Sequence, residues 1–164
     1  MTTTGALLAE FTHESATTRT HLARIPDDRL DWQPHPKSFT TRALASHIVE
    51  CVGWTPSIFG ADEFNFEPAT YRPFSASTVA ELLSVFDRKV EEGVRALSAI
   101  RDAAMGDPWR MKIRGQVRFE KPRADVFRDF TLSHVIHHRG QLTVYLRLLD
   151  VPVPGSYGPS ADEG

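Results

Sequence analysis

The chain has 164 residues, of which 41% are hydrophobic and 24% are charged, and its formal net charge is −2 with a pI near 6.4. This length fits one domain over residues 1–164, and the near-neutral charge gives no electrostatic reason to expect nucleic acid or a membrane as partner. No apolar run approaches the roughly 20 residues that cross a bilayer, and no signal peptide is recognisable at the N-terminus. The single cysteine, Cys51, suits a reducing compartment. The expected location is therefore the cytoplasm.

Two helices are predicted in the first part of the chain. The first covers about residues 4–24, where apolar residues recur at spacings of three and four, and Pro26 ends it. The second begins after Ser38 or Thr40, either of which can cap a helix, and weakens between Pro56 and Gly60. A long irregular loop rich in proline and aromatic residues is expected over residues 61–74.

Two further helices are predicted in the second part. The third starts at Ser75 or Ser77, has a clear apolar stripe and runs to about Ala104. Residues 109–119 alternate apolar and basic side chains around a glycine, which fits either a small hairpin or an extended loop. The fourth helix covers about residues 123–149, and a proline- and glycine-rich irregular tail follows. Four amphipathic helices indicate an all-α bundle.

A histidine pair in the fourth helix is the first sign of chemistry. His134 and His138 are four residues apart, so they lie only about 40° apart around the helix, with Cβ atoms roughly 5–6 Å from each other. Two imidazoles at this spacing can bind one metal ion. His137 and His138 diverge by about 100°, so these two cannot easily share an ion. A pair of His134 and His137, three residues apart, is possible and is the second choice.

The neighbours of this pair suggest that it is buried. An apparent core-facing stripe carries both histidines and also Phe127, Phe130, Gln141, Tyr145 and Leu148. A buried polar group without a partner costs on the order of 1–3 kcal/mol, and a metal ion would remove that cost. The alternative is a pair of neutral histidines bonded to buried carbonyls or to each other.

His47 on the second helix favours the metal interpretation. It lies on the apolar stripe between Leu44 and Cys51, and neighbouring helices of a bundle are about 8–10 Å apart, so it can reach the same ion. Three histidines leave a coordination position open, as in catalytic sites. Such an ion lowers the pKa of a bound water or thiol or activates a carbonyl. Imidazole ligands admit Zn, Ni, Fe or Cu.

Several other residues are candidates for the surroundings of the ion. Gln141, Glu50 and Tyr145 are candidate contacts to a ligand or substrate, although a solvated surface carboxylate is the simpler interpretation of Glu50. Cys51 lies one turn beyond His47 but is better read as a small core residue. Arg139 points about 140° away from His134 and is expected to pair with a carboxylate or a neighbouring chain. No catalytic residue is assigned.

Four segments, in this order, resemble the DinB/YfiT-like family of metalloenzymes. They are DWQPHP at residues 31–36, KSFTTRALASH at 37–47, SHVIHHRGQL at 133–142 and VPVPGSYGPSADE at 151–163. The resemblance spans most of the chain. It implies an antiparallel four-helix bundle, often a homodimer, with His47, His134 and His138 as ligands to nickel, zinc, iron or another divalent ion.

The resemblance also suggests an activity. Some relatives are transferases or isomerases that use a low-molecular-weight thiol such as bacillithiol or mycothiol, and the family label implies no DNA-repair function. We therefore expect a metal-dependent, thiol-using S-transferase. The alternatives are a metal-binding stress protein without turnover and a metal-free dimeric bundle with an ordinary buried histidine network.

Overall fold

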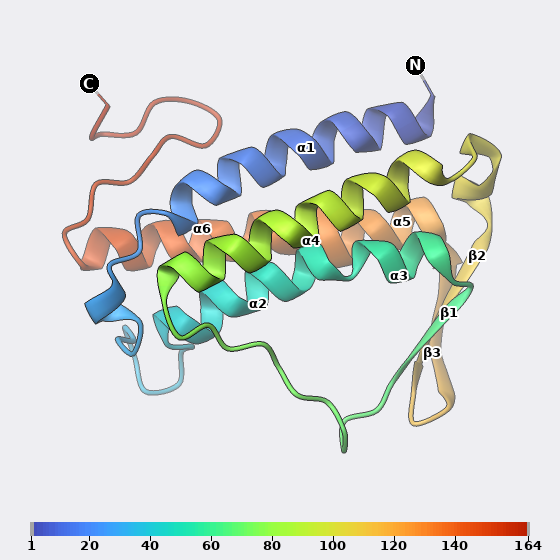
Figure 1. Cartoon of the computed structure of the whole chain (residues 1–164), viewed down its shortest axis with the longest axis horizontal. Helices are drawn as coiled ribbons and strands as arrows, with labels where there is room; N and C mark the ends of the chain where they lie inside the picture. Colours follow the sequence, from blue (N-terminus) through green and yellow to red (C-terminus); the bar gives the residue numbers. More distant parts are fainter. Residues whose placement is uncertain (1, 164) are drawn as a thin grey trace.

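The computed structural model describes residues 2–163, in which four long helices lie side by side (Figure 1). They are α1 (Thr3–Leu22), α2 (Thr41–Gly53), α4 (Val79–Ala99) and α6 (Ser133–Leu148). A short helix α3 (Thr55–Gly60) follows α2, and α5 (Arg123–Phe127) leads through a π-helical segment, η3 (Arg128–Leu132), into α6. Two 3-10 turns, η1 (Asp27–Arg29) and η2 (Asp102–Gly106), complete the helical elements. Within residues 2–163, no helix is both long and apolar enough to cross a bilayer.

The expectation of an all-α fold is wrong, because a three-stranded mixed sheet packs at one end of the helices (Figure 1). Strand β2 (Pro108–Ile113) lies between β1 (Glu63–Phe66), its parallel neighbour, and β3 (Gln116–Pro122), its antiparallel one. The hairpin alternative for residues 109–119 is confirmed, with Arg114 and Gly115 at positive φ in its turn. Strand β1 lies inside the segment predicted to be an irregular loop. The prediction missed this strand because its pairing partner, β2, comes from a distant part of the chain.

The helix starts follow from local capping. The Thr40 side chain accepts a hydrogen bond from the Ala43 N–H at 3.1 Å, which confirms one of the two predicted caps of α2. Helix α4 starts at Val79, later than the predicted start at Ser75 or Ser77, because Thr78 caps it and accepts from the Glu81 N–H at 3.1 Å, while the Glu81 carboxylate accepts from the Ser77 N–H. Helix α4 then stops at Ala99, short of the predicted end, and a 3-10 turn follows.

The π-helical segment changes which face of α6 is buried. One extra residue in the turn shifts the helical phase by about 100°, so Phe127 does not continue the stripe of His134. Instead Phe127 is buried in line with Val135 and Leu142, whereas Leu148, predicted to face the core, is 57% exposed. His134 therefore lies on the flank of the buried face and is half-buried, whereas His138 is buried.

Candidate metal site between α2 and α6

The structure brings together the three histidines that the sequence singles out. His47 projects from α2, and His134 and His138 project from α6. The Nε2 atoms of His47 and His134 are 3.3 Å apart. The ring of His138 lies 4.8 Å from that of His47 and 4.7 Å from that of His134, measured between centroids. One ligand atom each from His47, His134 and Cys51 all lie within 4.8 Å of one another.

Each of the three rings is held by an oxygen acceptor. The Nδ1 atom of His47 lies 3.4 Å from a Glu50 carboxylate oxygen, and that of His138 lies 2.7 Å from the Gln141 side-chain oxygen. His134 is hydrogen-bonded to the backbone carbonyl of Phe130 in the π segment. A ring whose one nitrogen donates to such an acceptor presents its other nitrogen as a metal ligand. Of these residues, His47 and His134, together with Cys51, have donor atoms close enough to hold one metal ion.

The electrostatics of the cluster favour neutral rings. Burial, together with the neighbouring His138 and His47, lowers the pKa of His134 to about 4. Burial also lowers the pKa of His138, against the opposing effect of its hydrogen bond to Gln141. Because metal ions bind the neutral imidazole, protons do not compete strongly for these two rings near neutral pH.

Cys51 is a second candidate for the third ligand. Its Sγ atom lies 3.7 Å from the His47 Nε2 atom, so the structure places it closer to the site than the sequence suggested. The thiol is buried, however, and burial together with the Glu50 charge raises its pKa to about 12. In the metal-free protein the thiol is therefore protonated, and only binding to an ion would ionise it.

Glu50 is not the solvated carboxylate that its sequence position suggested. Its side chain is only 13% exposed and accepts hydrogen bonds from the Tyr71 hydroxyl at 2.6 Å and from the Phe74 N–H at 2.9 Å. Burial raises the pKa of Glu50, but the hydrogen bonds with His47, Tyr71 and Phe74 outweigh that effect and lower it. Glu50 therefore remains ionised and ties the loop after β1 to a candidate ligand.

The other sequence candidates lie at different distances from the rings. Gln141 contacts His138 directly, as described above. Tyr145 is buried, and its hydroxyl donates to the Phe39 carbonyl at 2.9 Å, so it holds the segment before α2. Sequence reasoning missed Phe39, whose ring centre is 6.1 Å from that of His47, and Trp54, which is 6.2 Å from His134. No local pattern marks either aromatic residue as part of a site.

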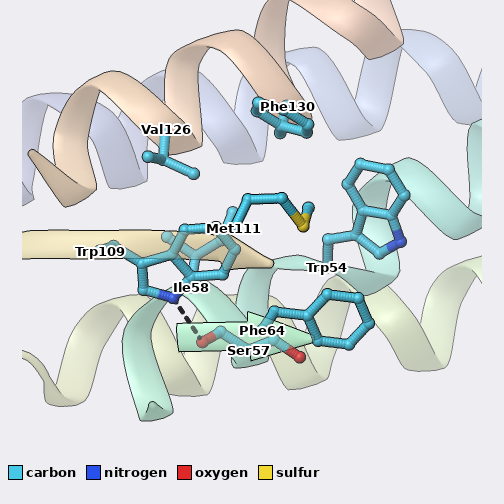
Figure 2. Close-up of a pocket in the computed structure, with 8 residues that line it drawn as sticks. All are labelled: Trp54, Ser57, Ile58, Phe64, Trp109, Met111, Val126 and Phe130. Carbon is cyan, nitrogen blue, oxygen red and sulfur yellow. Dashed lines mark hydrogen bonds between the residues drawn. The ribbon is translucent and has the colours of Figure 1, made fainter. Parts of the chain in front are cut away.

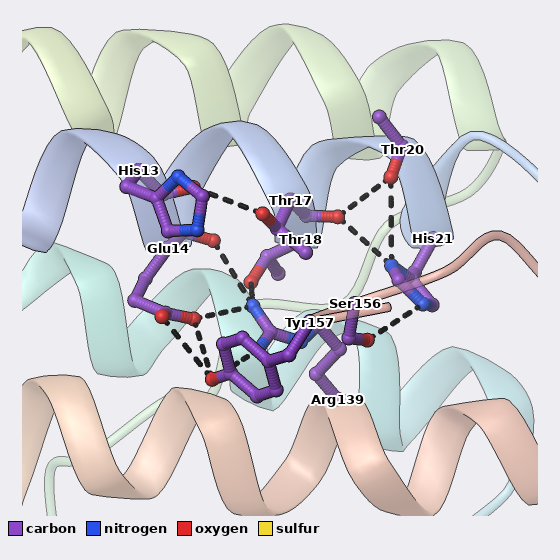
Figure 3. Close-up of polar contacts among 9 residues, drawn as sticks. All are labelled: His13, Glu14, Thr17, Thr18, Thr20, His21, Arg139, Ser156 and Tyr157. Carbon is purple, nitrogen blue, oxygen red and sulfur yellow. Dashed lines mark hydrogen bonds and ion pairs between the residues drawn. The ribbon is translucent and has the colours of Figure 1, made fainter. Parts of the chain in front are cut away.

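A buried ion pair anchors α6 to α1 (Figure 3). The Arg139 Nη1 atom lies 2.7 Å from a Glu14 carboxylate oxygen, which confirms the predicted carboxylate partner. The Tyr157 hydroxyl, from the C-terminal tail, donates to Glu14 at 3.0 Å and accepts from Arg139 Nη2 at 2.7 Å. This network fixes the position of the residue next to His138.

The metal-free protein is expected to lose stability as pH falls from about 6.5 towards 4. The ordinary pKa of histidine is 6.5 and that of folded His134 is about 4. Between these values the unfolded chain binds more protons, so this contribution to stability is complete above pH 6.5, declines as the pH falls through the window and is lost below about pH 4. Urea unfolding in the presence of a chelator at several pH values measures this. A His134→Gln variant should show a weaker decline, and an equal decline would assign the effect to other groups.

Known proteins resemble this chain in both sequence and fold. The sequence model of the DinB family matches residues 1–164. The uncharacterized protein YrdA of Bacillus subtilis (strain 168) is 27% identical over 161 residues, which cover 95% of this chain and 89% of YrdA. Two crystal structures of DinB-like proteins share the fold at a TM-score of 0.72. One is from Bacillus cereus ATCC 10987 (24% identity, 92% of this chain and 95% of that one), and the other is YjoA of Bacillus subtilis (17% identity, 92% and 97%).

Proposed function

Because this chain belongs to the DinB family and brings three imidazoles together between α2 and α6, we propose that it is a metal-dependent S-transferase that uses a low-molecular-weight thiol. One divalent ion is held by His47, His134 and His138. The observation that carries the proposal is that three histidine rings lie side by side. In each ring one nitrogen contacts an oxygen acceptor, which leaves the other nitrogen for the ion.

The proposed donor set suits thiol activation. When bound, a divalent ion with three neutral ligands lowers the pKa of a thiol at its open position and so supplies thiolate near neutral pH. The chain's own residues orient that site. Glu50, which is ionised, holds His47 through its Nδ1 atom, and Gln141 holds His138. His47 and His134 are half-buried, so the proposed open coordination position lies on their side of the site.

The nucleophilic thiol comes from a cosubstrate in this proposal. Cys51 is the one cysteine of the chain, and its pKa of about 12 keeps it protonated in the buried core. A thiol that is to be transferred must also leave with the product, which a side chain cannot do. These two facts support an external, low-molecular-weight thiol.

Cobalt substitution tests the proposal. Co²⁺ loaded into the protein should give a thiolate-to-cobalt charge-transfer band when dithiothreitol or glutathione is added, because the thiol ligates the open position as thiolate. The band should persist in Cys51→Ser, which excludes the internal thiol as its source. An unchanged cobalt spectrum at saturating thiol would contradict a thiol-dependent enzyme. It would leave the second candidate, a metal-binding protein without turnover.

We also propose a homodimer. The outer face of α6 exposes Val144 and Leu148 at 55% and 57%, which is compatible with a contact between copies. Light scattering coupled to size exclusion measures the mass directly. A mass of one chain across the micromolar range would reject the dimer.

A further inference from the structure

A small, partly open cavity lies between the sheet and the helices (Figure 2). Its volume is about 20 Å³. Three separate parts of the chain form its walls: the α2–α3 junction, the strands β1 and β2, and the α5–η3 segment. The lining residues are Trp54, Ser57, Ile58, Phe64, Trp109, Met111, Val126 and Phe130.

The walls of this cavity are almost wholly apolar. The Trp109 indole N–H does not face an unpaired group, because it donates to the Ser57 carbonyl at 3.3 Å. No charged side chain is among the lining residues. A polar or charged group placed here would lose its water without gaining a partner, whereas an apolar group would gain contacts with the apolar walls. The chemistry of the walls therefore selects an apolar occupant.

One side of the cavity is formed by the partly exposed side chain of Phe64. Phe64 is 36% exposed and lies on β1, a strand of four residues that is paired on one side only. Met111, which is half-buried, has a flexible thioether side chain that adapts to irregular spaces. The space admits little more than a methyl group. Rotation of the Phe64 ring towards solvent would enlarge it by roughly the volume of a phenyl group.

One wall of the cavity is shared with the candidate metal site. The Trp54 ring lies 6.2 Å from that of His134 and 5.7 Å from that of Phe130. Phe130 lines the cavity with its side chain, and its carbonyl accepts a hydrogen bond from His134. A molecule whose apolar end fills the cavity would therefore extend past Trp54 to the histidines.

We propose that this cavity binds the small apolar group, aliphatic or aromatic, of the electrophile that reacts at the histidine site, with Phe64 as its gate. The identity of the occupant as a substrate rests on the function proposed above. The binding itself does not, because the cavity is formed by residues that are not metal ligands.

Methyl NMR of the metal-free protein tests the binding independently of any metal. On titration with toluene, the methyl signals of Met111, Ile58 and Val126 should shift, while those of Leu97, in the core but outside the cavity lining, should not. Benzoate at the same concentration, which has a charge the cavity cannot pair, should leave all of these signals unchanged.

Two variants sharpen the test. Phe64→Ala should bind toluene roughly tenfold more tightly, because the missing ring leaves space for the ligand. The matched control is Phe66→Ala on the same strand, whose ring packs on Tyr71 outside the cavity lining and which should behave like the wild type. Val126→Met should fill the space and abolish the shifts.

The outcomes separate the two proposals. If toluene shifts none of the lining methyl signals in either the wild type or Phe64→Ala, the cavity proposal is overturned, whatever the cobalt spectrum shows. If toluene binds but the cobalt spectrum does not respond to thiol, the cavity stands as an apolar site and the transferase proposal fails.

Discussion

Arg139→Met is expected to lower the free energy of unfolding by about 3–5 kcal/mol, because it leaves the Glu14 carboxylate buried without its cation. The two side chains are 2% and 8% exposed, and their closest atoms are 2.7 Å apart. The Arg139 guanidinium also donates to the Thr18 hydroxyl, at 3.2 Å, and to the Glu14 backbone carbonyl, at 3.3 Å, so those acceptors lose a partner as well. Urea unfolding monitored by circular dichroism measures the loss.

An exposed ion pair between helices provides the matched control. Arg19 pairs with Asp87 at 2.7 Å, but these side chains are 48% and 42% exposed, so Arg19→Met should cost at most about 1 kcal/mol. The double variant Glu14→Gln/Arg139→Met should recover part of the loss, since no buried charge remains. If Arg139→Met destabilised the protein no more than Arg19→Met, the buried network would not hold α6 in place.

The second large effect is expected on metal affinity. His47→Ala and His134→Ala should each weaken zinc binding by more than about 100-fold, because loss of a direct ligand should exceed the 10–100-fold typical of losing an outer partner. Glu50→Gln, which alters the partner of His47, should weaken it by about 10–100-fold. Competition with a chromophoric chelator gives these affinities, and elemental analysis gives the stoichiometry.

Two further variants identify the third ligand. If His138 is that ligand, His138→Ala should match His47→Ala, and Cys51→Ser should bind zinc like the wild type. The reverse result would assign the third position to Cys51, whose thiol lies 3.7 Å from the His47 Nε2 atom. His137→Ala is the control for position, because His137 is exposed on the same helix. A large loss in His137→Ala would support the alternative His134–His137 pairing.

Much of the helical framework was predictable from local patterns. The spacing of Leu7 and Phe11 places the buried face of α1 correctly, and Thr40 caps α2 as its residue type suggests. The convergence of His47 on His134 also follows from their positions on neighbouring helices. These features depend on residues within one or two helical turns, or on the standard distance between packed helices.

The errors came from interactions that local periodicity does not contain. Strand β1 is four residues long and exists because β2 supplies its hydrogen bonds, so residues 63–66 alone predict only a loop. The π segment at residues 128–132 shifts the helical phase, so extrapolation from Phe127 misplaced the buried face of α6. Burial of Glu50 depends on Tyr71 and Phe74, which a loop brings to it.

The amino-acid sequence by itself determined the four amphipathic helices, the three histidines and their spacing, because these depend on residue type and helical repeat. Only the tertiary structure decided how those histidines are used. It placed them on the flank of the core, supplied an acceptor for each ring and closed an apolar cavity beside them with a sheet. The physical reason is that burial, hydrogen-bond partners and strand pairing are set by residues far apart in the chain, which only packing brings into contact.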